Sequence, residues 1–282
     1  MSLVNFNDIL AKAKEGKYAV GAFNFFIEED LKAIIGAAEE VNAPVIVMAS
    51  PSAIIHSAIP DIAHYIRKRA YLSSVPICLH LDHATDYSTI VRAMAAGFTS
   101  VMYDGSLLPY EENVKNTKEI VKIAHALNIT VEGEIGRVGR SEDGEEGIGT
   151  VLSVPEEVKE YVEVTSIDAC AIAIGSHHAM QKQEANLDFN RLKAIREVVD
   201  LPLVLHGSSG VVEDELKIIG ECGIQKVNIG TRLKRVFTDT MREIIARNPN
   251  LHNHVKILEA CTGAVKKEVI HKMELLGCTD NA

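Results

Sequence analysis

The chain has 282 residues, of which 47% are hydrophobic and 24% charged, and its formal net charge is −10. This length and composition are typical of one large α/β domain rather than two small ones. The negative charge argues against a nucleic-acid or anionic-membrane partner, and there is no run of about 18 apolar residues to span a membrane. The first 17 residues lack the apolar core of a signal peptide. The five cysteines include no CxxC pair, which favours reduced thiols in a cytoplasmic protein.

Eight short runs, most of them apolar without alternation, predict strands that are covered on both faces. They are Tyr18–Asn24, Pro44–Ser50, Pro76–His83, Ser100–Asp104, Thr130–Ile135, Ala169–Ser176, Leu201–His206 and Lys226–Thr231. A stretch with apolar residues at helical spacing follows each run: Glu28–Val41, Ile62–Leu72, Ser88–Ala96, Tyr110–Leu127, Pro155–Thr165, Phe189–Val199, Glu213–Cys222 and Leu233–Ala246.

Eight strand–helix units in this length predict a single (β/α)8 TIM barrel over residues 1–282. A doubly wound open sheet is the alternative, but the chain does not open with a G-x-G-x-x-G motif. Residues 251–282 are expected to be a C-terminal helical extension, with a helix over Leu251–Leu276 that covers the edge of the barrel or contacts another subunit. The loop Gly136–Thr150 is rich in Gly, Glu and Asp, which is typical either of a solvated loop or of a mobile lid.

Three of the apolar runs lead to a histidine: two end at His83 and His206, and His178 follows the run Ala169–Ser176 by two residues. The C-terminal ends of barrel strands converge on one face, so these side chains are expected to meet there. A lone histidine would most often be a structural residue, but three on converging strands match the open coordination of a catalytic Zn²⁺ or similar divalent ion. His80 is expected to be structural. Only one of the adjacent His177 and His178 can face the barrel axis, and we expect it to be His178.

Asp82 precedes the first of these histidines and is suited either to orienting a metal ligand or to acting as a general base. The metal would polarise a carbonyl and stabilise an enediolate. The small residues Gly207–Gly210 and Asn228–Thr231 follow the seventh and eighth strands, where barrels commonly bind phosphate.

With these residues in place, the chain resembles the class II (metal-dependent) ketose-bisphosphate aldolases, in particular the short, tagatose-bisphosphate-type branch. The resemblance runs from Phe6 to about Phe237. It rests on Ala22-Phe23-Asn24, His80-Leu81-Asp82-His83, Ser100 to Ser106, Glu111-Glu112-Asn113, Val131 to Gly136, Ile174 to His178, His206 to Gly210 and Lys226 to Thr231.

The resemblance implies a role for each matching residue. His83, His178 and His206 would bind the catalytic Zn²⁺, and Asp104 and Glu134 would belong to an alternative metal site. Asp82 would exchange the proton of the C4 hydroxyl group, and Glu142 would handle the proton on the dihydroxyacetone-phosphate carbon. Gly207, Ser209, Asn228 and Thr231 would hold the ketone and its phosphate, assisted by a monovalent cation such as Na⁺ or K⁺. Asn24 and Ser50 are further substrate-binding candidates.

Several residues depart from the family pattern. Ala179 stands where Gly is usual, Phe26 and Ile27 replace polar residues, and Gly230 replaces the aspartate of fructose-bisphosphate-specific members. Arg232 stands where an acidic residue is usual, and with Lys234 it adds positive charge near the aldehyde half of the substrate. These changes are either drift or an altered pocket for a terminal phosphate or sulfonate.

The resulting hypothesis is a zinc-dependent aldolase that cleaves a ketose 1-phosphate, of the tagatose or fructose 1,6-bisphosphate type, to dihydroxyacetone phosphate and an anionic aldehyde such as glyceraldehyde 3-phosphate. One alternative is a sulfofructose 1-phosphate aldolase that gives sulfolactaldehyde, and another is a non-catalytic partner subunit of an aldolase. A Schiff-base aldolase is disfavoured because no lysine ends the sixth strand, and a metal-dependent hydrolase because the first strand lacks His-x-His. The expected partners are a small phosphorylated sugar, a second copy or more in a homodimer or homotetramer, and possibly an aldolase partner subunit.

Overall fold

The structure is a computed structural model, and it describes residues 2–56, 58–140, 147–178, 180 and 185–282. Eight parallel strands close into a barrel in which β4 pairs with β5 and β11 pairs back to β2. The strands are β2 (Val20–Phe25), β3 (Val45–Ala49), β4 (Ile77–Ala84), β5 (Ser100–Tyr103), β6 (Thr130–Ile135), β8 (Ala169–Ile172), β10 (Leu203–Leu205) and β11 (Ile224–Ile229). This arrangement confirms the predicted (β/α)8 barrel.

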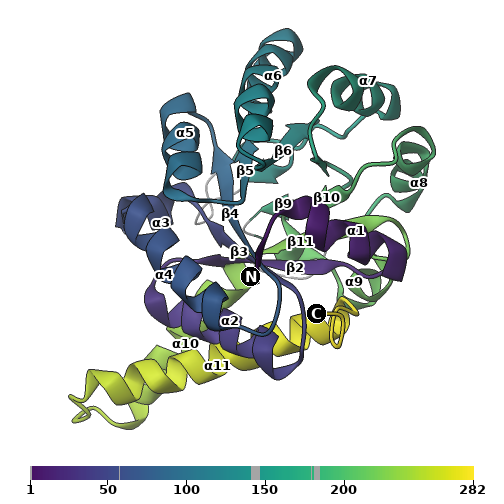
Figure 1. The fold of residues 1–282 in the computed structure, drawn as a ribbon. Coiled ribbons are helices and arrows are strands. Elements are labelled where there is room, and N and C mark those ends of the chain that lie inside the picture. Colours follow the sequence, from purple (N-terminus) through teal and green to yellow (C-terminus); the bar gives the residue numbers. More distant parts are fainter. Residues whose placement is uncertain (1, 57, 141–146, 179, 181–184) are drawn as a thin grey trace.

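Helices surround the barrel (Figure 1). They are α2 (Glu28–Glu40), α3 (Pro51–His56), α4 (Ile59–Leu72), α5 (Tyr87–Ala96), α6 (Tyr110–Ala126), α7 (Pro155–Thr165), α8 (Phe189–Val198), α9 (Glu213–Ile218) and α10 (Thr231–Arg247). Both faces of the strands are therefore covered, and every residue of β3, for example, is buried. N-cap residues mark the starts of two of these helices. The side chains of Asp86 and Asp188 accept hydrogen bonds from the first-turn amides of α5 and α8.

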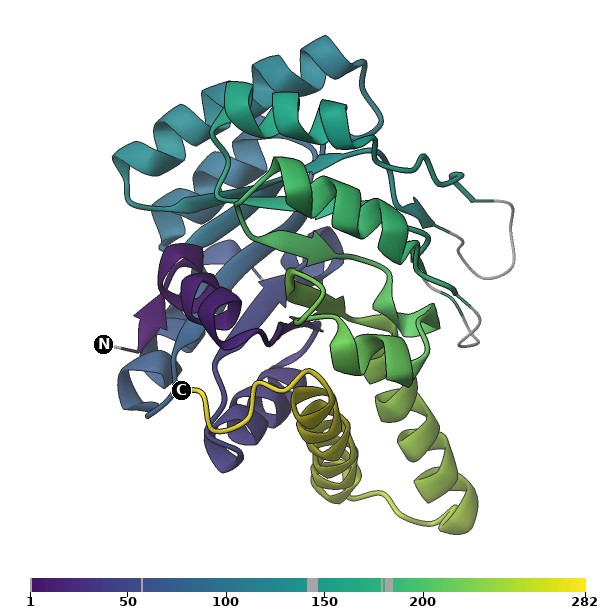
Figure 2. The same ribbon diagram turned by 90° about the vertical axis from the view of Figure 1, so that its right-hand side faces the viewer.

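An N-terminal segment that the sequence patterns did not identify closes one end of the barrel. Strand β1 (Leu3–Val4) pairs with β4, and α1 (Phe6–Gly16) starts at an Asn5 capping box. The helix buries Phe6, Ile9, Leu10 and Ala13. In Figure 2, α1 lies at one end of the barrel, opposite the loops that follow the strands.

The C-terminal helix α11 (His254–Leu275) agrees with the expected helical extension. It packs against both α2 and α10, the helices that follow the first and last strands of the barrel. It therefore covers the position where the barrel closes, and α10 and α11 extend together away from the barrel (Figures 1 and 2). Among the helices of the described ranges, none has the length and apolar character needed to cross a membrane.

Two strands, β8 and β11, end at least two residues earlier than the sequence predicts. Strand β8 stops at Ile172 because the chain turns at Gly175, whose φ is +111°, and His177–His178 then form β9. This short strand pairs with β7 (Gly139–Arg140) in a separate two-stranded sheet. Strand β11 stops at Ile229, and Thr231 already begins α10.

Candidate active site

A cavity of about 360 Å³ opens at the C-terminal ends of the strands. Most of the candidate residues from the sequence line it, together with Phe26, Pro51 and Ser208. The candidates on its wall are Asn24, Ser50, Asp82, His83, His178, Gly207, Ser209, Asn228, Gly230, Thr231 and Lys234. His206 is fully buried beside this wall. Glu142 and Ala179, which were also candidates, lie outside the described residues.

An irregularity in β4 brings two adjacent side chains, Asp82 and His83, to the same cavity. Adjacent residues of a regular strand point to opposite faces. His83 adopts a left-handed conformation with φ +49°, and the pairing of β4 with β5 shifts register between Leu81 and Ala84. This conformation costs a non-glycine residue about 1–2 kcal/mol. The bulge is the local feature that allows a base and a metal ligand to be sequence neighbours.

Asp82 is held by two amide groups from other strands. Its Oδ2 accepts a hydrogen bond from Asn24 Nδ2 at 2.8 Å, and its Oδ1 accepts one from Asn228 Nδ2 at 3.2 Å. Burial alone would raise the pKa of Asp82, but the nearby His83, His206 and Lys226 lower it below its usual range. The carboxylate is therefore ionised and able to accept a proton.

The imidazoles of His83, His178 and His206 form a cluster. One ring nitrogen from each residue lies within 4.8 Å of the others, a spacing that can hold a metal ion. The ring planes are steeply inclined to one another, at 74° to 85°. His177, by contrast, has its Nδ1 3.5 Å from Thr150 Oγ1. The structure thus brings together the three histidines that the sequence selected.

Carboxylates hold two rings of this cluster by their second nitrogen, as is usual for metal-binding histidines. His83 Nδ1 is 2.8 Å from Asp104 Oδ2, and His206 Nε2 is 2.7 Å from Glu132 Oε1. Burial lowers the pKa of His83, but Asp82 and Asp104 outweigh it and raise the pKa to about 9. Burial lowers the pKa of His206, although the hydrogen bond to Glu132 opposes this effect. The donor set therefore fits a divalent metal ion.

A second group of potential metal ligands consists of His83, Asp104 and Glu134. Glu134 is buried, and burial together with Asp104 raises its pKa to about 8. The Oε2 atom of Glu134 has no hydrogen-bond partner among the described residues. These residues agree with the alternative metal site that the family resemblance implies.

The glycine-rich loops after β10 and β11 form another wall of the cavity. Gly207 has φ +65°, and a Cβ atom there would lie 2.6 Å from the backbone of His177. The loop continues as a 3-10 helix over Ser208–Gly210, where Ser208 Oγ donates to the carbonyl oxygen of Asn228. The buried Ser209 Oγ has no hydrogen-bond partner among the described residues. Backbone amides and hydroxyls in such loops are suited to binding phosphate.

Arg232 and Lys234, the two basic candidates, point to different places. Arg232 forms an ion pair with Glu268 of α11, with Nε 3.0 Å from Oε1, and it lines a neighbouring cavity. Lys234 lines the main cavity, and its Nζ lies 4.2 Å from the centre of the Phe26 ring. Arg232 therefore lies outside the cavity that holds the other candidates. Both residues lie in the first turn of α10, which begins at Thr231. Residues two positions apart on a helix point to different sides.

The ends of the glycine-rich loop after β6 are fixed to the rest of the fold. Arg137 and Val151 exchange backbone hydrogen bonds of 2.7 and 2.9 Å. Gly139 lies so close to His177 that a Cβ atom would be 2.4 Å from its ring. Residues 141–146 lie outside the described ranges. The described part of this loop therefore runs beside the strand that carries His178.

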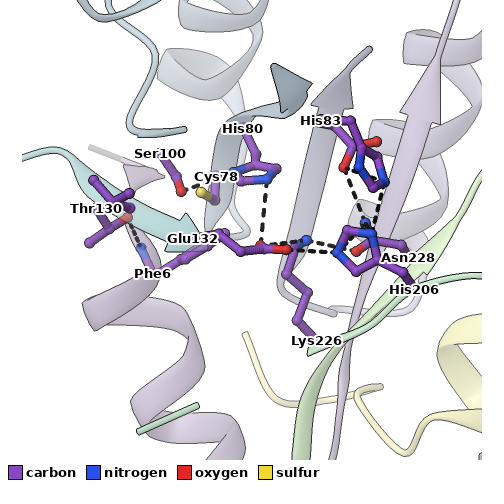
Figure 3. A network of polar contacts seen from close by, with 12 residues as sticks. Phe6, Cys78, His80, His83, Ser100, Thr130, Glu132, His206, Lys226 and Asn228 are labelled. Carbon is purple, nitrogen blue, oxygen red and sulfur yellow. Dashed lines mark hydrogen bonds and ion pairs between the residues drawn. The ribbon is translucent and has the colours of Figure 1, made fainter. Parts of the chain in front are cut away.

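Sequence reasoning did not identify the ion pair between Lys226 and Glu132 inside the barrel. Lys226 and Glu132 are both fully buried, and Lys226 Nζ lies 2.8 Å from Glu132 Oε2 as an ion pair (Figure 3). His80 is nearby, with Nδ1 2.9 Å from Ser100 Oγ, and it does not line the cavity. Its position is that of the structural residue that the sequence predicts. A charged residue in each of two buried strands was the signal in the sequence, but this signal does not say which charges pair.

Comparison with known proteins identifies the family. The family model described as fructose-bisphosphate aldolase class-II matches residues 4–281. The chain belongs to the class-II fructose-bisphosphate aldolase family. Membership of this family makes the protein a lyase.

Individual relatives extend this result. The chain is 38% identical to the fructose-bisphosphate aldolase of Geobacillus stearothermophilus over 285 residues, which cover 100% of this chain and 99% of the relative. The crystal structure of the YdjI aldolase from Escherichia coli K12 is similar, with a TM-score of 0.86, 31% identity and 99% of both chains covered. The fructose-bisphosphate aldolase of Campylobacter jejuni shares the fold, with a TM-score of 0.85 at 22% identity over 100% of this chain and 97% of its own.

Proposed function

We propose that this class-II aldolase uses a zinc ion, held by His83, His178 and His206, to cleave a ketose 1-phosphate reversibly into dihydroxyacetone phosphate and an anionic aldehyde. The observation that carries this proposal is the position of Asp82. An ionised carboxylate lies beside a cluster of three imidazoles, in a cavity that is also lined by phosphate-type loops.

Zinc favours low coordination by imidazoles, and when bound it would supply a Lewis acid that polarises the ketone carbonyl. Asp82 takes the proton from the hydroxyl group on C4 as the C3–C4 bond breaks, and returns it in the synthetic direction. Asn24 and Asn228 keep the carboxylate in place through the two hydrogen bonds described above. By family resemblance, Glu142 moves the proton on the dihydroxyacetone-phosphate carbon next to the ketone.

The phosphate of the ketone half is assigned to Gly207, Ser209 and Thr231, with Asn228 nearby and a monovalent cation such as Na⁺ or K⁺ beside it. These residues follow β10 and β11 in the barrel order. The anion of the aldehyde half is assigned to Lys234 and Ser50, on the side of the cavity next to β2 and β3. A cation at this end suits a terminal phosphate or sulfonate.

Gly230 bears on the choice of sugar. A Cβ atom at this position would lie 2.5 Å from Asn24 Oδ1, so the aspartate of fructose-bisphosphate-specific members would displace Asn24. This close contact favours a substrate of the tagatose 1,6-bisphosphate type. The enzyme would then belong to the short branch of the family. It would work as a homodimer or homotetramer, with or without a partner subunit. Sulfofructose 1-phosphate is the second candidate, because Lys234 suits either anion.

The test is a coupled assay of dihydroxyacetone-phosphate release by the zinc-loaded enzyme, with tagatose and fructose bisphosphates and sulfofructose 1-phosphate supplied in turn. We expect one of the three to be cleaved at least tenfold faster than the others, measured as kcat/KM. Trapping of a covalent adduct by borohydride during turnover would instead indicate a Schiff-base mechanism and contradict the proposal.

A further inference from the structure

A fully buried ion pair lies beside His206, one of the three imidazoles of the cluster. Glu132 comes from β6 and Lys226 from β11, and 2.8 Å separates Oε2 of Glu132 from Nζ of Lys226 (Figure 3). Moving both charges out of water is costly, and apolar residues of similar size often stabilise a core equally well. The stability of the barrel therefore does not explain why this pair is there.

The carboxylate of Glu132 controls the ring of His206. Its Oε1 lies 2.7 Å from His206 Nε2, and an ionised carboxylate can only accept a hydrogen bond. Its other oxygen, Oε2, forms the buried ion pair with the ammonium group of Lys226, so the carboxyl group carries its negative charge. His206 must therefore carry its proton on Nε2. Its Nδ1 lone pair then faces the cluster, 2.9 Å from His83 Nε2.

The ammonium group of Lys226 controls a second side chain, Asn228. Nζ is 2.7 Å from Asn228 Oδ1, and an ammonium group can only donate. The amide of Asn228 is thereby fixed with its oxygen toward Lys226 and its Nδ2 toward Asp82 Oδ1, at 3.2 Å. The opposite amide rotamer would place two donor groups against each other.

We propose that Glu132 and Lys226 are positioning residues that set the His206 tautomer and the Asn228 amide orientation as one unit. Through these two contacts, a single buried pair aligns both a metal ligand and the carboxylate that moves the proton. The inference rests on the proposed function for the identity of the metal and the base, whereas the tautomer itself is independent of any activity.

The first experiment uses the unaltered, metal-free protein. Imidazole ¹⁵N chemical shifts, measured by NMR and assigned to His206 by comparison with a His206→Gln variant, report which ring nitrogen carries the proton. We expect the proton on Nε2. A proton on Nδ1 would overturn the proposal, and neither result depends on a variant of Glu132 or Lys226 that folds.

The second experiment uses Glu132→Gln, which keeps the shape but gives one amide oxygen and one NH₂ group. Lys226 needs the oxygen, so the NH₂ group faces His206 and forces the proton onto Nδ1. Zinc affinity, measured by competition with a chelator, is expected to fall by about 10–100-fold. Unchanged affinity would contradict the assigned role of Glu132.

The double variant Glu132→Gln/Lys226→Met provides the matched control. Without Lys226, the amide oxygen is free to turn toward His206, and zinc affinity is expected to recover to within about threefold of the original. The kcat at saturating zinc is expected to stay at least about tenfold low, because Asn228 has lost the donor that orients it. Zinc affinity as weak as in the single variant, or a fully restored kcat, would overturn the proposal.

These outcomes separate the inference from the proposed function. If the unaltered enzyme binds zinc and has the expected tautomer but cleaves none of the three sugars, then the proposed substrate class is wrong and the positioning role stands. If the sugars are cleaved and His206 carries its proton on Nδ1, the positioning role is wrong and the proposed function stands.

Discussion

Asn24 and Asp82, at the ends of β2 and β4, are joined by a 2.8 Å hydrogen bond from Asn24 Nδ2 to Asp82 Oδ2. Asn228 Nδ2 donates to the other carboxylate oxygen from β11. Three strands thus converge on one carboxyl group, which is held ionised next to the imidazole cluster. This arrangement makes Asp82 the most direct target for mutagenesis.

Asp82→Asn is expected to reduce kcat for sugar cleavage by roughly 10²–10⁴-fold, because an amide cannot accept the hydroxyl proton. Exchange of solvent hydrogen into dihydroxyacetone phosphate should be retained within about tenfold, since Asp82 is assigned to the C4 hydroxyl and not to the carbon next to the ketone. Steady-state kinetics and NMR-monitored exchange measure the two effects. Equal loss of both activities would argue against this division of roles.

Lys234→Met is expected to raise KM for a sugar with two anionic groups by roughly 10–100-fold, the loss expected for about 1.5–3 kcal/mol of charge-assisted hydrogen bonding. Hydrogen exchange into dihydroxyacetone phosphate alone should be unchanged, because Lys234 is assigned to the aldehyde half and not to the ketone half. The control is Lys118→Met, which removes a lysine exposed on α6. If Lys234→Met instead weakened only the exchange reaction, Lys234 would belong to the ketone half.

Gly207→Ala is expected to lower the free energy of unfolding by about 1–3 kcal/mol, because the backbone is left-handed there and the new methyl group meets His177. The loop would move away from the strand that carries His178, so KM for the phosphorylated sugar should rise as well. Denaturant unfolding provides the measurement. Gly149→Ala is the matched control, because a Cβ atom at Gly149 meets nothing within 4 Å. Equal effects of the two substitutions would contradict the packing argument.

The pH dependence of stability should contain a contribution from His80. Burial and Lys226 lower the pKa of His80 to about 3, so the folded protein keeps this ring neutral where the unfolded chain, with a pKa of about 6.5, binds a proton. The unfolded state binds more protons in this window. The free energy of unfolding therefore falls as the pH falls from about 6.5 to about 3.

His80→Gln removes this proton uptake and should flatten the acid limb by up to about 1.4 kcal/mol per pH unit. The measurement is urea unfolding of metal-free protein at several pH values between 4 and 7, so that release of a bound metal ion does not intervene. The same slope in both proteins would show that His80 titrates normally in the folded state.

The fold could be predicted because apolar strands and amphipathic helices alternate regularly, as Val45–Ala49 and Glu28–Glu40 illustrate. The N-terminal helix Phe6–Gly16 was not predicted. It precedes the first strand–helix unit, and its four buried residues face the end of the barrel rather than its side. Its burial depends on the end of the barrel, which exists only once the barrel has closed.

The sequence was sufficient to predict which strand ends carry the histidines, the aspartate and the small residues of the site. The register shift at His83 could not be predicted, because it depends on pairing with β5. The direction of Arg232 could not either, because it depends on Glu268 in a helix that follows much later in the chain. Glu132 and Lys226 lie in strands whose hydrophobic pattern gives no reason to pair them. In each case the missing information is a contact between distant segments.

A zinc titration of the metal-free enzyme, with the rate of sugar cleavage recorded at each addition, tests the catalytic metal site most directly. We expect no cleavage without metal and a rate that saturates at one zinc ion per chain. His178→Ala should lose both the zinc and the rate. Full activity without metal, or zinc binding that persists unchanged in His178→Ala, would contradict the assignment of the three histidines as the catalytic metal site.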